Sequence, residues 1–199
     1  MTRAQNRSAM RTSSASLLLP AMFIGLLSFA TLVSAAGETY TATAQVKSAG
    51  GVTASAPVTV SIDRLSTDQD REALVAAIKK GGTDAARALL LPKPPIGTVK
   101  IGAQSTAIKY AYSRPGSGGG GRVITIVTGS PIAYIGASVP GAPVKSGFYL
   151  GLLALDVAAS GPGHGELSGA AKVTVNDQGA IVTQDYSGEA VQLQNVTGK

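Results

Sequence analysis

The six tyrosines are the residues whose type and placement most suggest a binding site. A tyrosine combines an apolar ring with a hydroxyl group, and this combination suits small-molecule sites. Each of them falls within a strand-like stretch: Tyr40, Tyr110, Tyr112, Tyr134, Tyr149 and Tyr186. In a barrel several of them could line one cavity, and we take Tyr110, Tyr112 and Tyr149 as candidate ligand-binding residues. Ordinary packing in a core or on a sheet surface is the alternative explanation.

His164 is the only histidine of the chain and lies in the glycine-rich stretch 161–166, which predicts a loop. Glu166 follows two residues later, so a general base with a nearby carboxylate is one interpretation. A catalytic imidazole must be fixed by a partner and aimed at the reacting group. The neighbours Gly163 and Gly165 supply little packing for this purpose. We therefore expect an outward-facing, solvated residue.

Other catalytic and metal-binding motifs are missing from the sequence. The chain has no cysteine, which excludes disulfides, thiolate metal sites and cysteine nucleophiles. The segment 136–140 lacks the last glycine of a nucleophile elbow, and the glycine run 118–121 lacks the Gly-Lys-Ser/Thr of a phosphate-binding loop. The acids at 68, 70 and 72 suit the first turn of a helix, and the further oxygen ligands that calcium needs are missing. We expect neither a metal nor a cofactor.

The spacing of apolar residues predicts a mainly β structure. Alternation with a period of two, as in half-buried strands, occurs in the segments 38–47, 58–63, 108–113 and 167–175. Further strands are predicted at 122–128, 148–157, 180–186 and 189–196, and a further apolar piece at 131–135.

Between the second and third predicted strands the period changes to that of a helix. Ser66, with Gln69 three residues later, has the spacing of a capping box. The stretch 79–82, Lys-Lys-Gly-Gly, is typical of a helix C-terminus, and Thr83-Asp84 predicts the start of a second short helix. The sequence therefore predicts an antiparallel β-sandwich or small β-barrel with an inserted helical pair at about 66–91. Periodicity does not decide between sandwich and barrel.

The N-terminus has the pattern of a secretory signal peptide. Residues 1–16 carry three arginines and no acid, an apolar run follows, and small residues close it at 34–36. An uncleaved membrane anchor is the alternative, because the run is close to the shortest that spans a bilayer. We expect a signal peptide at 1–36 and a single β-rich domain at 37–199, located in the periplasm or secreted.

The charge of the predicted mature domain is small. Removing the three arginines of the signal leaves fourteen basic residues against eleven acidic ones. Apart from Lys79-Lys80 they are scattered singly, so there is no basic stripe that could follow a phosphate backbone. We expect no nucleic-acid partner.

Several segments are similar to a known group of proteins. The stretch 61–68, Ser-Ile-Asp-Arg-Leu-Ser-Thr-Asp, leads into a helix that begins Asp-Arg-Glu-Ala-Leu at 70–74. Together with 122–128 and 173–176 it resembles a group of uncharacterised bacterial secreted proteins of unknown function. The resemblance implies an extracytoplasmic location and a fold, and it supplies no site residues.

Three classes of function remain open at this point. The absence of catalytic motifs favours a non-enzymatic exported binding or interaction module, with a small apolar ligand inside a barrel or an envelope protein as its partner. A hydrolase whose site is assembled by the fold, for example from His164 and Glu166, is the alternative from another class. A structural cell-envelope component acting through sheet edges is the third. Contact with a membrane is expected only through an uncleaved signal.

Overall fold

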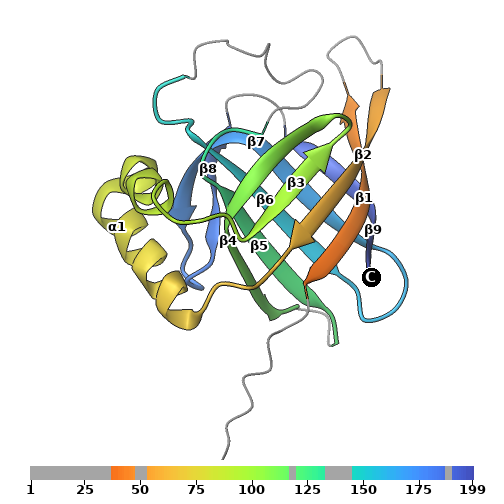
Figure 1. Cartoon of the computed structure of the whole chain (residues 1–199), viewed down its shortest axis with the longest axis horizontal. Helices are drawn as coiled ribbons and strands as arrows, with labels where there is room; N and C mark the ends of the chain where they lie inside the picture. The colour runs from red at the N-terminus through yellow and green to blue at the C-terminus, as the bar shows by residue number, and fades with distance from the viewer. Residues whose placement is uncertain (1–36, 48–52, 117–119, 133–144, 187–189) are drawn as a thin grey trace, which may run out of the picture. The chain divides into compact units, whose positions relative to one another are not determined.

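The computed structural model describes residues 37–47, 53–116, 120–132, 145–186 and 190–199 (Figure 1). These residues belong to one compact unit, Ser34–Lys199. The predicted signal peptide at 1–36, Tyr134, the segment 136–140 and the part of the apolar piece beyond Ile132 lie outside the described residues.

The described chain forms nine strands and one helix. In chain order they are β1 (Glu38–Lys47), β2 (Thr53–Ile62), α1 (Asp68–Leu90), β3 (Gly97–Ile101), β4 (Gln104–Pro115), β5 (Arg122–Thr128), β6 (Leu150–Val157), β7 (Gly163–Val175), β8 (Ile181–Tyr186) and β9 (Val191–Gly198). All pairs are antiparallel, and each strand from β2 to β7 lies beside the strand that precedes it in the chain, with α1 inserted between β2 and β3. Because β9 pairs with both β7 and β1, the sheet closes on itself. The structure is therefore a closed antiparallel barrel of eight strands, and the sandwich alternative is wrong.

Strand β8 stands apart from this ring because it pairs with β7 alone among the described strands. It lies opposite residues 171–175 of β7, whereas β9 lies opposite residues 163–167. The turn before β8 is held by Asn176, whose side-chain oxygen accepts from the backbone N–H groups of Gln178 and Ala180. The two strands therefore follow one another along β7, and the end of the β7–β8 hairpin leaves the barrel wall beside α1 (Figure 1).

The barrel interior is filled by one cluster of buried apolar side chains. Its members come from all the strands of the ring: Tyr40, Ala44, Val58, Val60, Ile62, Ile96, Val99, Ile101, Ile108, Ala111, Ile124, Ile126, Ile132, Leu153, Leu155, Leu167, Val191, Leu193 and Val196. Eight strands give an interior that side chains can just fill. Burial of this cluster is the main apolar contribution to the stability of the barrel.

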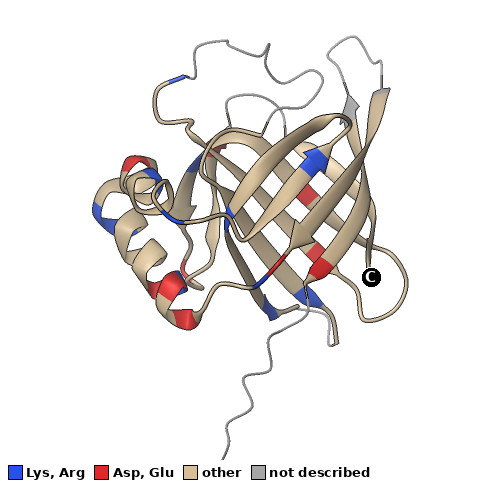
Figure 2. Cartoon of the chain, viewed as in Figure 1, with Lys and Arg blue, Asp and Glu red and all other residues tan. Residues whose placement is uncertain are grey.

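Helix α1 covers a second apolar cluster on the outside of the barrel (Figure 1). Leu74, Ile78 and Leu90 from the helix pack with outward-facing residues of β4, β5, β6, β7 and β8. Charged side chains are sparse on the strands and concentrate on this helix, with acids at its N-terminal end (Figure 2). As the predicted helical pair requires, the element α1 consists of two helical segments that meet at non-helical backbone at Gly81 and Gly82, and Gly82 adopts a φ of +61° that favours glycine.

Thr83 ties the helix to the sheet directly after this break. Its side chain is buried, and its Oγ1 accepts a hydrogen bond of 2.9 Å from the backbone N–H of Val173. Val173 lies on the part of β7 beyond the last β6 pair, Leu150 with Ala171. The hydroxyl therefore satisfies a buried N–H group that has no strand partner on that side.

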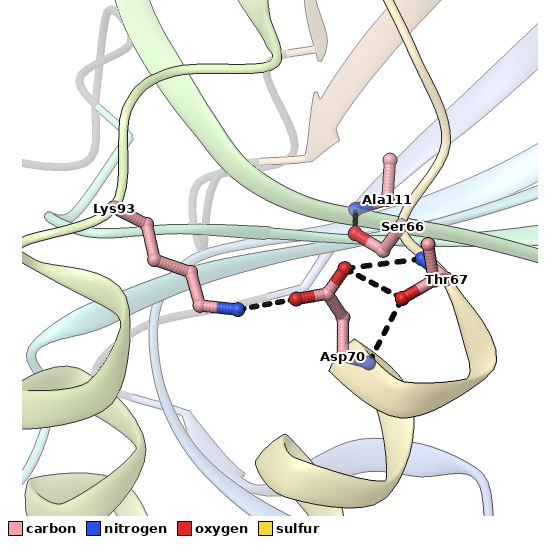
Figure 3. A network of polar contacts seen from close by, with 5 residues as sticks. All are labelled: Ser66, Thr67, Asp70, Lys93 and Ala111. Carbon is pink, nitrogen blue, oxygen red and sulfur yellow. Dashed lines mark hydrogen bonds and ion pairs between the residues drawn. The ribbon is translucent and has the colours of Figure 1, made fainter.

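The start of α1 is fixed by a polar network (Figure 3). Thr67 is the N-cap: its Oγ1 accepts from the Asp70 N–H at 3.2 Å, and Asp70 Oδ2 accepts from the Thr67 N–H at 3.2 Å. Lys93 forms an ion pair of 2.5 Å with Asp70. These contacts, led by the one to Lys93, lower the pKa of Asp70 to about 2. The network fixes both the start of the helix and the segment that follows it.

The predicted capping box of Ser66 and Gln69 is wrong by one residue. Ser66 instead pairs with β4, where its Oγ accepts from the N–H of Ala111 at 3.1 Å and its N–H donates to the Ala111 carbonyl at 2.7 Å. Adjacent serine and threonine residues are both good caps. The pairing with Ala111 leaves Thr67 to cap the helix.

Candidate functional site

The outer face of the strands β4–β7 carries a row of four directly opposed residues. Tyr112 lies opposite Thr125, Thr125 opposite Ala154, and Ala154 opposite Glu166. Directly opposed side chains on one face are neighbours. Two small residues therefore lie between two large ones, and this leaves a depression in the middle of the row.

Two hollows of about 190 and 240 Å³ lie on this face. Arg114, Thr125 and Ile181 line both of them, so the two hollows are neighbours, and we call them together the outer groove, with the smaller hollow as its first half and the larger as its second. Ile181 comes from β8 and Arg71, in the first half, from α1. The groove exists because the helix and the β7–β8 hairpin rise beside the barrel wall.

The first half of the outer groove is cationic and aromatic. Its lining includes Arg71, Tyr110, Tyr112 and Arg114. The two tyrosine rings are stacked, with centroids 6.4 Å apart and planes inclined by 15°, and the Arg71 guanidinium carbon lies 5.6 Å from the Tyr112 centroid. The Tyr112 hydroxyl donates to Asp68 at 2.7 Å. A planar group could stack on these rings while an anion binds the guanidinium groups.

The guanidinium groups of this half have unused hydrogen-bonding capacity. Within the part of the chain that the structure describes, neither Arg71 nor Arg114 forms an ion pair with a carboxylate. The Nε atom of Arg71 is buried and has no hydrogen-bond partner among the described residues. A buried donor without a partner is unusual in folded proteins and calls for an explanation.

The second half of the outer groove is acidic and rich in hydroxyl groups. Glu166 accepts a hydrogen bond from the Tyr186 hydroxyl, and the Ser168 and Thr183 hydroxyls are 3.0 Å apart. All four residues line this half, together with Arg114. No ion pair within 4.0 Å joins Glu166 to Arg114 or to another cation of the described chain. The groove thus holds opposite charges that do not neutralise each other directly.

The tyrosine hydroxyls of the groove act as neutral groups. Burial raises the pKa of Tyr110, and the hydrogen bonds to Asp68 and Glu166 raise the pKa values of Tyr112 and Tyr186. All three therefore stay protonated well above neutral pH. They can stack and hydrogen-bond, but they offer no phenolate for nucleophilic or base chemistry.

The structure brings two of the three candidate tyrosines together. Tyr110 and Tyr112 line the outer groove, on the outside of the barrel and not in its interior. Tyr149 lies elsewhere: its ring packs 5.1 Å from the guanidinium carbon of Arg87, and its hydroxyl is 3.4 Å from Ser146 Oγ. Among the described tyrosines, Tyr40 is the one in the interior cluster, where its hydroxyl donates to Glu38 at 2.6 Å.

His164 lies in strand β7, so the predicted loop is wrong at this position. Its side chain is 78 % exposed, as an outward-facing residue should be, and its Nε2 lies 3.6 Å from Asp156 Oδ2. Neither residue lines the outer groove. Glu166, two residues along the strand, hydrogen-bonds to Tyr186 and not to the imidazole.

A third hollow, of about 430 Å³, lies between the segment 157–162 and the end of β9 at 196–198. Its lining contains no charged side chain, so it offers less chemistry than the outer groove. In the described ranges no group of three or more His, Asp or Glu residues is placed to hold a metal ion. Among the helical segments that the structure covers, none is both long and apolar enough to cross a membrane.

Sequence reasoning missed the two arginines of the outer groove and considered Glu166 only as a partner of His164. Arg114 follows Tyr112 by two residues and therefore shares its face, which is the only local signal. Arg71 lies in α1 and Glu166 in β7, both far from Tyr112 in the sequence. Their proximity depends on tertiary packing and register, which a single sequence does not display.

The fold and the groove define a closed eight-stranded antiparallel barrel with a charged outer groove beneath a helix and a hairpin. Comparisons with protein-family models, with curated proteins and with solved structures give no match to this chain. The resemblance to uncharacterised bacterial secreted proteins therefore stays a prediction, and the fold assignment rests on the strand pairing alone.

Proposed function

We propose that this protein is an exported, non-enzymatic binding module that holds a small carboxylate-bearing molecule in the outer groove. The observation that carries the proposal is the pair Arg71 and Arg114, which have no carboxylate partner among the described residues and lie beside the stacked rings of Tyr110 and Tyr112. Export rests on the predicted signal peptide at 1–36.

The chemistry of the first half supports this choice of ligand. Guanidinium groups bind carboxylates through paired, charge-assisted hydrogen bonds. Because the Nε of Arg71 is buried, the terminal N–H groups of this guanidinium are the donors that such a ligand would use. The two tyrosine rings provide a flat surface for an aromatic or other planar body attached to the carboxylate. The size of the groove suits a small molecule at the lower end of known ligand pockets, which begin at about 300 Å³.

The proposal moves the ligand from the inside of the barrel to the outside. The expected apolar ligand would have needed space in the interior, which a continuous cluster of buried side chains occupies. The outer groove is lined by arginines, a glutamate and hydroxyl groups. Its chemistry therefore favours a charged ligand over an apolar one.

Titration of the secreted protein with benzoate tests the proposal. Benzoate combines a carboxylate with a planar ring, and its binding can be followed by calorimetry and by NMR shifts of groove residues. We expect saturable binding that Arg71→Gln and Arg114→Gln each weaken by at least about tenfold. Arg64→Gln, which changes an exposed arginine outside the groove lining, is the matched control and should leave the Kd unchanged.

Two results would contradict the proposal. One is the absence of saturable binding of both benzoate and 4-(aminomethyl)benzoate up to about 10 mM. The other is binding that persists unchanged in Arg71→Gln and Arg114→Gln while thermal unfolding shows both variants to be folded.

A further inference from the structure

We infer that the ligand of the outer groove is dipolar, with an ammonium group that binds Glu166 at the end opposite to the carboxylate. This inference rests on the proposed function and specifies the ligand more closely. It follows from the arrangement of charges, from the spacing across the strands and from the polar groups around Glu166.

The arrangement of charges is the first argument. Arg114 and Glu166 line the same half of the groove, yet no ion pair within 4.0 Å joins them. Opposite charges in a partly enclosed site attract strongly, because the effective dielectric constant there is lower than in water. Because the two side chains form no direct ion pair, each can still attract an opposite charge on a ligand. A molecule with one negative and one positive end matches both.

The spacing is the second argument, and it decides how far apart the ligand's charges lie. The row from Tyr112 to Glu166 crosses four adjacent strands. Three steps between neighbouring strands place the backbones of its ends about 14 Å apart. Thr125 and Ala154 between them are too small to fill this distance. A carboxylate bound by Arg71, which lies over the Tyr112 ring, and an ammonium group at Glu166 must therefore be several bonds apart in the ligand, as in a short peptide or an ω-amino acid, and not on one carbon atom.

The polar groups around Glu166 are the third argument. An ammonium group has three N–H donors and no acceptor, so it needs several oxygen atoms around it. The carboxylate of Glu166 can accept more hydrogen bonds than the one from Tyr186. The Ser168 and Thr183 hydroxyls line the same half and add further oxygen atoms. This half therefore provides acceptors in the number that an ammonium group requires.

The test uses two isomeric zwitterions that differ in the distance between their charges. In 4-(aminomethyl)benzoate the ammonium and carboxylate groups lie at opposite ends of a benzene ring, and in phenylglycine they share one carbon atom. We expect 4-(aminomethyl)benzoate to bind at least about tenfold more tightly than benzoate. Phenylglycine should bind no more tightly than benzoate, because its ammonium group cannot reach Glu166.

A variant identifies the residue responsible. Glu166→Gln keeps an oxygen acceptor for Tyr186 but removes the negative charge, so 4-(aminomethyl)benzoate should no longer bind this variant more tightly than benzoate does, which the ratio of the two Kd values measured on the same variant reports. Glu72→Gln is the matched control, because Glu72 is an exposed acid on α1 outside the groove lining, and this variant should retain the wild-type ratio.

The outcomes separate this inference from the proposed function. If benzoate binds and depends on Arg71, but 4-(aminomethyl)benzoate binds no more tightly, the inference is overturned and the proposed function stands. It is also overturned if phenylglycine binds as tightly as 4-(aminomethyl)benzoate. The same holds if 4-(aminomethyl)benzoate still binds more tightly than benzoate to Glu166→Gln. If neither benzoate nor 4-(aminomethyl)benzoate binds, the proposed function itself fails.

Discussion

Strands β5 and β6 carry aliphatic side chains on the face toward the barrel interior and a mixture of apolar, small and polar side chains on the outside. Ile124, Ile126, Leu153 and Leu155 point inward into one cluster. On the outside, Thr125 and Ala154 form part of the groove. The inner face is buried by closure of the barrel itself. The outer face is buried only where α1 and β8 cover it, and the uncovered remainder is the candidate site.

The largest expected effect distinguishes the two faces at adjacent positions of β6. Leu153 is 0 % exposed in the interior, and Leu152 is 5 % exposed at the edge of the outer groove. We expect Leu153→Ala to lower the free energy of unfolding by about 3 kcal/mol, through lost burial and a cavity that cannot collapse. Leu152→Ala should cost less, about 2 kcal/mol, because neighbouring groups and water can reach the space.

Urea unfolding of the two variants measures this difference. Equal losses, or a larger loss for Leu152→Ala, would mean that the outer cluster contributes as much to stability as the interior does. The contrast between the two faces would then have to be abandoned.

The next effect concerns the hydrogen bond that attaches α1 to β7. Thr83→Val keeps the shape of the buried side chain but leaves the Val173 N–H without its acceptor. We expect a loss of about 1–3 kcal/mol in the free energy of unfolding. Hydrogen exchange at Val173 should also become faster. Thr83→Ser, which keeps the hydroxyl, is the control; a similar loss in both variants would show that the hydrogen bond is not what matters.

A smaller effect is expected from the network at the start of α1, and it depends on pH. The folded-state pKa of Asp70 is about 2, below its ordinary value of 3.8, so the charged carboxylate stabilises the folded protein above that ordinary value. This contribution is lost as the pH falls toward 2. Because Asp70 is 30 % exposed, we expect Asp70→Asn to cost only about 1 kcal/mol near neutral pH.

Urea unfolding at pH 6 and near pH 2 tests this pH dependence. The difference between the wild type and Asp70→Asn should shrink at the lower pH, whereas Asp63→Asn, at an exposed acid outside the network, should show no such trend. A difference that is constant with pH would contradict the assigned role of the ion pair with Lys93.

The smallest effect is expected at His164, on the outer face but outside the groove. With its side chain 78 % exposed, His164→Ala should change the free energy of unfolding by no more than about 0.5 kcal/mol. Benzoate titration should give the wild-type Kd. A large loss of binding in a variant that unfolds at the wild-type temperature would extend the functional surface beyond the outer groove.

The sequence predicts the strands well because alternation depends only on local burial. It does not predict which face the tyrosines occupy. Ile108, Tyr110 and Tyr112 have the same parity in sequence, yet Ile108 points into the barrel and both tyrosines point out. A β-bulge between Ile108 and Tyr110 shifts the register and reverses the faces. Nothing in the local pattern indicates that bulge.

Closure and the outer groove depend on contacts between distant segments, and this is why the sequence did not predict them. The choice between sandwich and barrel is made by the pairing of β1 with β9, at opposite ends of the described chain. The groove needs Tyr112, Thr125, Ala154 and Glu166 in one row, which requires three correct registers in succession. Composition and period leave all of these undetermined.

The pairing of β1 with β9 also imposes an order on folding. The hydroxyls of Thr41 and Thr197 lie 3.0 Å apart although 156 positions separate them in the chain. Such a long-range contact carries a high loop-closure entropy and slows folding. Until residues 191–198 dock, β1 keeps an unpaired edge that can associate with other chains. We therefore expect yield during refolding to be limited by aggregation through this edge, and to improve as the protein concentration is lowered.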